Sequence, residues 1–420
     1  MIDPQSKTAD GCSEPRLLPL ADALARMLAA TASLTQTEDV LVGDCLDRIL
    51  AAPINAAIDV PAHDNSAMDG YALRAADAGT PLQLIGTALA GHPFAGTVAT
   101  GSCVRIMTGA PLPAGADCVV MQENTVVTGA AVTITQAPSV DENIRHRGED
   151  IAAGQPVLAR GHRLGPVDIG LLASLGIDRV TVYRRLRVAV LSTGDELVAP
   201  GQPLGASQIY DSNRYAISAM LQRLGADIID LGLIRDDADA IATALQRAAA
   251  QADAVVSSGG VSVGDADFVK DTLERMGSIG FWKVAIKPGK PFAFGSLRNS
   301  AGGNIWFFGL PGNPVSSVVT LHQLALPILR HLAGEAVTPA LQLQIPAGTR
   351  FRKQPGRTDF QRAYLHNRDD INQVDSNGPQ GSGVLTSFAG ANCYVVLEQE
   401  RGTVDAGETV AVQLFDRFLT

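Results

Sequence analysis

The chain has 420 residues, 46% of them apolar and 18% charged, which excludes general disorder and predicts two to four domains. With 33 basic and 43 acidic residues its formal net charge is −10, the wrong sign for a protein that binds nucleic acid. It contains no apolar run of membrane-spanning length and no signal-peptide pattern, so we expect a cytoplasmic protein without a membrane partner.

The first part of the chain changes character twice. Apolar residues recur at helical spacing over residues 20–28, and a second helical turn is expected at residues 47–51. Residues 59–150 contain short apolar runs separated by Gly, Pro and Asn, which predict an inserted, mostly β domain. Residues 151–185 return to a helical pattern, so we expect them to join residues 1–58 in a helical domain.

Beyond residue 186, strand and helix patterns alternate. Strands are expected at residues 188–191, 227–231, 254–256 and 304–308, and helices at residues 213–224, 237–252 and 314–332. This alternation is typical of a parallel sheet with crossover helices. We therefore predict a multidomain α/β and β protein, with a parallel-sheet α/β domain at residues 186–334. A small C-terminal β-barrel-like domain is expected at residues 335–420.

The first strand of the α/β domain is followed by residues 192–196 (STGDE). Ligands of open α/β sheets bind beyond the carboxyl ends of the strands. The hydroxyls of Ser192 and Thr193 and the carboxylates of Asp195 and Glu196 could hold a ribose, a metal or a pterin amide. The alternative is a loop that only caps the next helix.

A glycine-rich segment, residues 257–267 (SSGGVSVGDAD), follows the third strand. Gly259 and Gly260 would let backbone N–H groups approach a phosphate closely, and Asp267 would supply an oxygen ligand for Mg²⁺. Asp267 could equally cap a helix. The segment lacks the G-x-x-x-x-G-K-[ST] form of an ATPase phosphate-binding loop.

Three lysines occur within residues 281–291 (FWKVAIKPGKP). If the run is one strand, Lys283 and Lys287 share a face. A type II turn at Pro288 and Gly289 would then bring Lys287 close to Lys290. An anion such as phosphate or molybdate would explain three clustered charges, whereas a solvated basic hairpin is the alternative.

A second helix start is expected at residues 309–314 (GLPGNP), which follow an apolar strand. Asn313 suits the N-cap position and Pro314 the first helical position. Helix punctuation explains this motif by itself, although it delivers a second helix N-terminus to the same edge of the sheet.

Six segments in this order carry a resemblance over nearly the whole chain. They are residues 64–72 (DNSAMDGYA), 147–150 (RGED), 192–196 (STGDE), 258–262 (SGGVS), 287–291 (KPGKP) and 309–314 (GLPGNP). Together they resemble the MoeA family, the bacterial relatives of the gephyrin and Cnx E domains. The resemblance implies four domains per subunit, an elongated homodimer, and transfer of molybdate onto molybdopterin-AMP with release of AMP, dependent on Mg²⁺. The product would be molybdenum cofactor.

Carried over position by position, the resemblance implies catalytic roles for Asp69, Glu196, Asp267, Lys287 and Lys290. Glu196 and Asp267 would also lie at the metal. From the motifs and the resemblance together, the residues expected to bind substrate are Thr108, Arg145, Asp150, Ser192, Thr193, Asp236, Gly259, Gly260, Ser262, Lys283, Pro291, Pro311, Asn313, Arg357 and Ser382. Lys287, Lys290, Pro291, Arg357 and Ser382 would form the molybdate pocket. The chain departs from the family pattern in an extension through Arg16, an insertion at residues 299–303, and Gly383.

The resemblance also implies how the site is assembled. It places the cleft between the β unit of one subunit and the sheet domain of its twofold mate, which gives two composite sites per dimer. Catalysis would be positional and electrostatic, because the dithiolene sulfurs that bind molybdenum belong to the substrate. A transient contact with other molybdenum cofactor proteins is expected.

Two alternatives stay open at the level of sequence. The α/β domain resembles MogA-type adenylyltransferases, which carry out the preceding adenylylation of molybdopterin. Gephyrin uses the same module as a scaffold, although it does so with an extra domain and a linker. Adenylylation from ATP would indicate the first alternative, and absence of turnover with either substrate would favour the second.

Overall fold

The computed structural model describes residues 17–260, 272–273, 275–299 and 303–420. Contacts divide the chain into two compact units. Unit 1 contains the described residues of 1–38, 47–49 and 182–420, and unit 2 contains residues 39–46 and 50–181. The chain passes between the units within β1 (Thr37–Leu41) and β12 (Arg179–Tyr183).

Unit 2 consists mainly of short strands. Its elements are β2 (Ile54–Asn55), β3 (Asn65–Ser66), β4 (Gly70–Leu73), β5 (Leu82–Ala88), β6 (Ser102–Ile106), β7 (Cys118–Met121), β8 (Thr125–Thr128), β9 (Ala131–Ile134), β10 (Ile144–Arg145), β11 (Pro156–Leu158) and α2 (Pro166–Ser174). Six strands form one sheet in the order β7-β4-β6-β5-β9-β8. Leu73, Leu82 and Val132 are buried in its core. The predicted β character of this part of the chain is confirmed.

The helical turn expected at residues 47–51 is wrong. Asp47 has a φ of 63°, in the left-handed region that ends helices. The N–H of Leu50 donates to the carbonyl of His162 at 3.0 Å, so its hydrogen bond goes to a distant segment. Non-local pairing therefore overrides the local helical pattern.

Unit 1 contains a six-stranded sheet with helices on both faces. Its elements are β13 (Arg187–Thr193), β14 (Leu197–Val198), β15 (Ile209–Tyr210), α3 (Asn213–Leu224), β16 (Asp227–Ile234), α4 (Ala238–Gln251), β17 (Ala254–Ser258), β18 (Gly277–Lys283), β20 (Pro291–Arg298), β21 (Asn304–Leu310), α6 (Pro314–Thr320) and α7 (Leu326–Leu332). The sheet order is β16-β13-β17-β21-β20-β18. The first four strands are parallel, as predicted. Strand β20 pairs antiparallel with β21, and β18 pairs antiparallel with β20.

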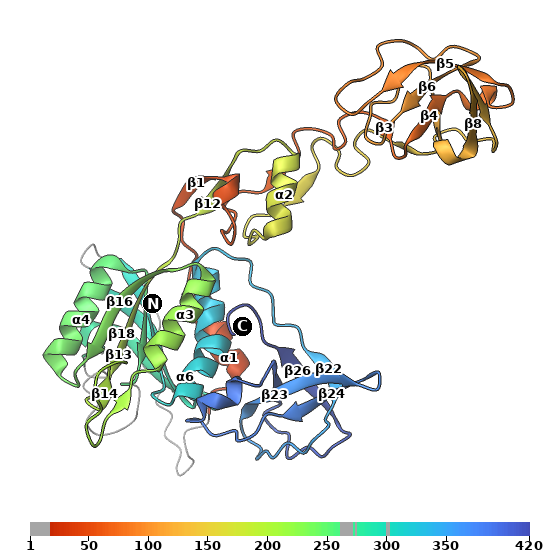
Figure 1. Ribbon diagram of the computed structural model, residues 1–420. Coiled ribbons are helices and arrows are strands. Elements are labelled where there is room, and N and C mark those ends of the chain that lie inside the picture. The colour runs from red at the N-terminus through yellow and green to blue at the C-terminus, as the bar shows by residue number, and fades with distance from the viewer. Residues whose placement is uncertain (1–16, 261–271, 274, 300–302) are drawn as a thin grey trace. The chain divides into compact units, whose positions relative to one another are not determined.

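Burial of apolar faces holds this sheet between its helices. Helix α4 lies on one face, while α3 and α6 lie on the other (Figure 1). Ile241 and Leu245 of α4 pack with Val255 and Phe307 of the sheet in one buried cluster. Replacing Leu245 with Ala would lower the free energy of unfolding by about 2–5 kcal/mol, the usual effect of a cavity in a core. The sheet is thus a rigid base for the loops at its edge.

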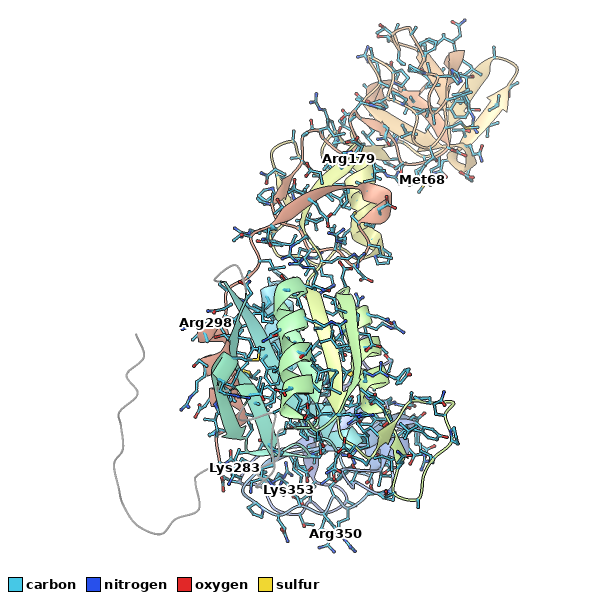
Figure 2. The ribbon with its side chains drawn as sticks, turned by 90° about the vertical axis from the view of Figure 1, so that its left-hand side faces the viewer. Met68, Arg179, Lys283, Arg298, Arg350 and Lys353 are labelled. Carbon is cyan, nitrogen blue, oxygen red and sulfur yellow. The ribbon has the colours of Figure 1, made fainter. Side chains whose placement is uncertain are left out.

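The antiparallel pair β18–β20 places two charged residues at opposite ends of the sheet. Lys283 ends β18 opposite Pro291, and Arg298 ends β20 opposite Asn304 (Figure 2). Lys283 therefore lies toward the turn that connects the two strands. Arg298 marks the other end of the pair.

A second sheet in unit 1 is formed mostly by the C-terminal part of the chain. Its strands are β19 (Ile286–Lys287), β22 (Leu343–Pro346), β23 (Thr358–Arg368), β24 (Ile371–Ser376), β25 (Cys393–Leu397) and β26 (Thr409–Leu414). The order is β19-β23-β25-β26-β22, and β24 pairs with β23. Because β19 lies in the chain between β18 and β20, this sheet takes one strand from the α/β region. That exchange fixes the C-terminal domain beside the turn after Lys287.

The N-terminal helix α1 (Leu20–Ala30) packs against α7. The N–H of Leu18 donates to the carbonyl of Lys283 at 2.9 Å, and the N–H of Ala285 donates back to Leu18 at 2.7 Å. These contacts group α1 with the α/β region. The sequence pattern instead placed residues 1–58 in one helical domain with residues 151–185. The boundaries of the four domains remain a prediction. No helix in the described ranges is long and apolar enough to cross a membrane.

Candidate active site

The strand order of the α/β sheet determines where a ligand can bind. From β13 the chain proceeds to β16 on one side, and from β17 it proceeds to β18, β20 and β21, which all lie on the other side. Loops that leave β13 and β17 therefore diverge and open a crevice at the carboxyl ends of these strands. Thr193, at the end of β13, and Ser258, at the end of β17, lie at this point.

A cleft with a volume of about 1040 Å³ occupies this position. Ligand pockets commonly measure roughly 300–1,000 Å³, so this one is large enough for a nucleotide-sized ligand. The cleft brings together twelve of the predicted site residues: Thr193, Glu196, Asp236, Gly259, Gly260, Lys287, Lys290, Pro291, Pro311, Asn313, Arg357 and Ser382. They come from the α/β sheet, the turn after β19 and the C-terminal domain.

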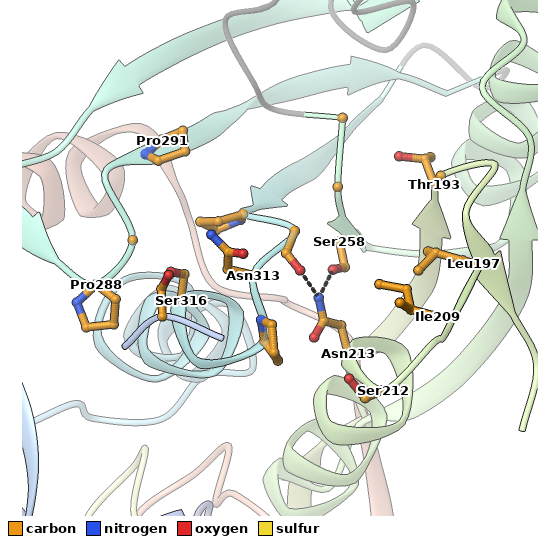
Figure 3. A pocket seen from close by; sticks show the side chains of 18 of the residues that line it. Thr193, Leu197, Ile209, Ser212, Asn213, Ser258, Pro288, Pro291, Asn313 and Ser316 are labelled. Atoms are coloured by element: carbon orange, nitrogen blue, oxygen red, sulfur yellow. Dashed lines mark hydrogen bonds between the residues drawn. The ribbon is translucent and has the colours of Figure 1, made fainter. Parts of the chain in front are cut away.

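The middle of the cleft is neutral and polar. Asn213, the first residue of α3, donates from Nδ2 to Ser258 Oγ at 2.8 Å and to the carbonyl of Gly312 at 2.7 Å (Figure 3). This amide ties the ends of three segments together beneath the cleft. Thr193 Oγ1 is buried and has no hydrogen-bond partner among the described residues. A buried hydroxyl without a partner at a cleft wall is explained when a ligand completes its hydrogen bond.

One end of the cleft is cationic. Lys287, Lys290 and Arg357 line it, and Lys287 Nζ lies 3.0 Å from Asp359 Oδ2. Asp359 is buried, with 2% of its surface exposed, and also accepts a hydrogen bond from Gln361 Nε2 at 3.1 Å. No carboxylate in the described part of the chain pairs with Lys290 or Arg357. These two cations are therefore free to meet an anion.

The turn between the lysines depends on Gly289. Its φ is +113°, a backbone conformation that L side chains rarely adopt. A Cβ at this position would lie 2.2 Å from Thr320 Oγ1 at the end of α6. The turn thus packs tightly on α6, which fixes where Lys287 and Lys290 begin.

The acidic residues lie on the opposite side of the cleft, because Thr193 and Leu197, which flank Glu196 in the chain, lie across the cleft from Pro288 and Pro291 (Figure 3). Glu196 and Asp236 line the cleft, and the N–H of Asp236 donates to Asp195 Oδ1 at 3.3 Å. Partial loss of hydration, together with the negative charges of Asp195 and Glu196, raises the pKa of Asp236 above its ordinary value. A cation bound at this end would relieve the mutual repulsion of the carboxylates.

These carboxylates fit a Mg²⁺ that shares its ligands with substrate. Within the residues that the structure places, no three His, Cys, Asp or Glu side chains form a ready metal site. Mg²⁺ commonly takes only one or two carboxylates and completes its shell with phosphate oxygens and water. Glu196 and Asp236 match that pattern, and the predicted ligand Asp267 lies outside the described residues.

Two predicted residues lie near the cleft without lining it. Ser192 is fully buried and donates to Asp211 Oδ1 at 3.1 Å. Lys283 ends β18 in the α/β sheet, while Lys287 belongs to β19 in the C-terminal sheet. The condition for a shared face, that residues 281–287 form one strand, is therefore not met, because the chain changes sheets between Lys283 and Lys287. Lys283 and Lys287 do not share a strand face.

Of the predicted residues of unit 2, Asp69 and Thr108 are in direct contact. Asp69 Oδ1 accepts from the N–H of Thr108 at 2.7 Å and from its hydroxyl at 2.8 Å. These hydrogen bonds lower the pKa of Asp69 below its ordinary value, so the exposed carboxylate is ionised at neutral pH. Arg145 pairs with Asn65 across β10 and β3, and the N–H of Asp150 donates to the carbonyl of Val60 at 3.1 Å.

Ser262, like Asp267, lies outside the described residues.

Several residues of the cleft were missed by the sequence analysis. Asp211 lines the cleft and is 1% exposed, where its carboxylate binds the guanidinium of Arg214 at 2.8 Å. Asn213, Leu197 and Gln380 also line it. The only available signal was position, since Asn213 begins a predicted helix at the ligand-binding edge. Gln380 had no signal, because its loop reaches the cleft through the fold of a separate domain.

Comparison with known families covers most of the chain. Residues 18–176 match the "MoeA N-terminal region (domain I and II)". Residues 189–331 match the "Probable molybdopterin binding domain", and residues 344–415 match the "MoeA C-terminal region (domain IV)". Every residue that lines the cleft falls within the second or the third of these regions.

Individual relatives agree with this match. The chain is 46% identical to the molybdopterin molybdenumtransferase of Haemophilus influenzae over 96% of its own length and 100% of that protein. It is 35% identical to the molybdopterin molybdenumtransferase of Nostoc sp., over 95% and 93% of the two chains. The fold is similar to that of the molybdopterin biosynthesis moeA protein from Pyrococcus horikoshii OT3, with a TM-score of 0.83, 27% identity, and coverage of 95% and 100%.

Proposed function

This chain belongs to the MoeA family of molybdopterin molybdenumtransferases, and we propose that its cleft inserts molybdate into molybdopterin-AMP with release of AMP. The chain is accordingly a transferase of molybdenum cofactor biosynthesis. The observation that carries the proposed site is the charge arrangement of one large cleft, with Lys290 and Arg357 at one end and Glu196 and Asp236 at the other.

The cationic end suits molybdate. Lys290 and Arg357 supply charge, and Ser382 supplies a hydroxyl donor, so together they bind a tetrahedral oxyanion and neutralise charge as its oxygens leave. Lys287 adds a further donor, whose charge is partly compensated by Asp359. The chemistry needs no protein nucleophile, because the dithiolene sulfurs of the substrate become the ligands of molybdenum. The role of these side chains is to hold the oxyanion beside the sulfurs.

The acidic and neutral parts of the cleft suit the pterin and the nucleotide. Asn213, Thr193 and the glycines after β17 offer hydrogen-bond groups along the cleft wall. Glu196 and Asp236, with Asp267, would hold Mg²⁺ against the phosphate. When bound, Mg²⁺ would neutralise phosphate charge and favour attack of an oxygen, from water or molybdate, on the phosphoanhydride-like bond, which then breaks and releases AMP. Asp236→Asn should therefore raise the Mg²⁺ concentration needed for half-maximal AMP release.

We further propose a homodimer in which Asp69 and Thr108 of one subunit complete the cleft of the other. The ionised carboxylate of Asp69, which is exposed and held in place by Thr108, supports this arrangement, as does the match of residues 18–176 to the family's N-terminal region. Mixed dimers of Asp69→Ala and Lys290→Ala subunits should carry both lesions in one site and leave the other site intact. Random reassociation should then restore about a quarter of wild-type activity. Mixed dimers that are verified by mass and stay inactive would overturn the shared site.

The proposed setting is the cytoplasm, with transient contacts to other molybdenum cofactor proteins. These proposals rest on the biosynthetic role of the relatives. Localisation of a tagged full-length chain and crosslinking in cells would test both.

A three-arm assay tests the proposed reaction. The protein is incubated with molybdopterin-AMP and Mg²⁺, with or without molybdate, and AMP is measured. Release that requires molybdate supports the transferase. Formation of molybdopterin-AMP from molybdopterin and ATP would instead support an adenylyltransferase, and no turnover in either arm would support a scaffold. Asp375→Asn, in the C-terminal sheet away from the cleft, provides a matched control for variants of the cleft residues.

A further inference from the structure

We propose that Arg362, a buried residue of β23 that does not line the cleft, is the positioning residue that holds residues 380–382 at its cationic end. The inference rests on the proposed function, because those residues lie beside the proposed molybdate position. Gln380, Gly381 and Ser382 line the cleft, and Arg362 lies behind them with no exposed surface.

The guanidinium of Arg362 binds the loop from inside the domain. Its Nε donates to Ser387 Oγ at 2.9 Å, its Nη1 to the carbonyl of Phe360 at 3.1 Å, and its Nη2 to the carbonyl of Gly381 at 3.5 Å. One planar group therefore joins the strand, the cleft-lining residue and the far end of the loop. A planar fork fixes relative positions better than single donors on flexible chains do.

The backbone of Arg362 holds the same loop a second time. Its N–H donates to Gln380 Oε1 at 2.8 Å, and its carbonyl accepts from Gln380 Nε2 at 2.9 Å. The N–H of Asn377 donates to that carbonyl as well, at 3.1 Å. Both polar atoms of the Arg362 backbone are thus used by the loop.

The loop is also attached on its other side. The carbonyl of Ser382 accepts a hydrogen bond from the N–H of Val315, in the first turn of α6, at 2.9 Å. Ser382 is therefore held between β23 and the helix that supports the Gly289 turn. A shift of Arg362 would move the hydroxyl of Ser382 relative to Lys290 and Arg357.

The burial of this cation is difficult to explain by stability. No carboxylate in the placed parts of the chain forms an ion pair with Arg362, and burial lowers the pKa of its guanidinium. An unpaired buried charge is costly, and apolar residues usually fill such positions with equal or better stability. Its hydrogen bonds to the loop are the feature that an apolar residue could not reproduce.

The same strand offers a matched control. Asn392 bridges the backbone of Leu365 as Gln380 bridges that of Arg362, with Leu365 N–H to Asn392 Oδ1 at 2.7 Å and Asn392 Nδ2 to the Leu365 carbonyl at 2.8 Å. Asn392 does not line the cleft. Asn392→Ala therefore removes an equivalent pair of hydrogen bonds from β23 without touching residues 380–382.

The test compares full-length Arg362→Met, Arg362→Lys, Gln380→Ala and Asn392→Ala. We expect Arg362→Met and Gln380→Ala to raise the KM for molybdate about 10- to 100-fold, because displacement of binding groups by about 1 Å has effects of this order. The KM for molybdopterin-AMP should change less than about twofold, since the acidic and neutral parts of the cleft supply most of the proposed contacts to its pterin and nucleotide. Arg362→Lys should restore part of the loss, and Asn392→Ala should leave both constants unchanged.

Hydrogen exchange supplies a readout that does not depend on turnover. The amide of Val315 and the amides of residues 380–382 should exchange faster in Arg362→Met and Gln380→Ala than in Asn392→Ala at matched melting temperature. If wild-type protein releases no AMP with molybdate, the proposed function fails while exchange still decides the positioning role. An unchanged KM for molybdate in an active Arg362→Met or Gln380→Ala variant would overturn the positioning role. The same outcome would follow if the amides of Val315 and residues 380–382 exchanged equally fast in Asn392→Ala. Should Arg362→Met not fold, Arg362→Lys and Gln380→Ala carry the same comparison.

Discussion

Lys287 Nζ lies 3.0 Å from the buried carboxylate of Asp359, and the two residues face each other across the parallel strands β19 and β23. This pairing neutralises one of the lysines that the sequence places at the oxyanion site. Lys290 and Arg357 therefore provide the net positive charge of the cationic end. The roles of Lys287 and Lys290 should differ accordingly.

Asp359→Asn should tighten molybdate binding. The amide preserves size and can still accept a hydrogen bond from Lys287, but the compensating negative charge is lost. One more uncompensated charge near the surface is worth about 1 kcal/mol, or roughly fivefold in Kd at low ionic strength. Titration calorimetry with molybdate at two salt concentrations checks this, with Asp375→Asn as the control. Equal or weaker binding in Asp359→Asn would show that Asp359 orients Lys287 rather than limiting its charge.

Lys290→Ala and Lys287→Ala should separate binding from stability. Lys290→Ala should raise the Kd for molybdate about 10-fold or more, the usual effect of losing a charge-assisted hydrogen bond, without lowering the melting temperature. Lys287→Ala leaves Asp359 buried without its cation and should destabilise the protein by about 1–3 kcal/mol.

The double variant Lys287→Ala/Asp359→Asn should recover most of that stability, because it leaves no unpaired buried charge. Urea unfolding measures both effects. If Lys290→Ala unfolds earlier than Lys287→Ala while binding molybdate normally, the assignment of the two roles is reversed.

Asp236→Asn should increase the stability of unit 1 at neutral pH. The folded protein raises the pKa of Asp236, so ionising this group costs more in the native state than in the unfolded state. The cost is absent below the unfolded pKa, grows as pH rises toward the folded pKa, and is complete above it. The melting temperature of the variant should therefore be higher than that of the wild type at pH 7, and the two should be equal at acidic pH. Asp239→Asn, in the first turn of α4, should show no gain, since it removes an acidic residue from a helix N-terminus.

Asp253→Asn should show the opposite dependence on pH. Burial disfavours its charge, but hydrogen bonds from Arg184 at 2.6 and 2.8 Å and from Arg187 at 2.8 and 3.1 Å outweigh that effect and lower its pKa. Its stabilisation is present above the unfolded pKa and is lost as pH falls through the folded pKa. We expect the variant to lose about 2–4 kcal/mol at pH 7. The gap from wild type should close below about pH 4. A constant gap would show that shape rather than charge explains the loss.

Local patterns were enough to predict the four parallel strands of the α/β sheet, but not the antiparallel strand β20. The helix expected at residues 213–224 matches α3, and Thr193, Gly259 and Asn313 lie at the cleft because strand ends meet at one edge. Local sequence patterns did not predict which distant strands pair with each other. The separation of Lys283 from Lys287 depends on β19 joining β23, whose Asp359 is 72 residues from Lys287. The same non-local geometry places Arg362 behind Ser382.

The central claim is tested most directly by counting molybdenum and AMP in one reaction. Protein loaded with molybdopterin-AMP and Mg²⁺ is titrated with molybdate, and the molybdenum bound to the pterin and the free AMP are both measured. The account predicts equal amounts of the two, none without molybdate, and a parallel loss in the Lys290→Ala/Arg357→Ala variant. AMP release at the same rate without molybdate, or undiminished insertion in that variant, would contradict it.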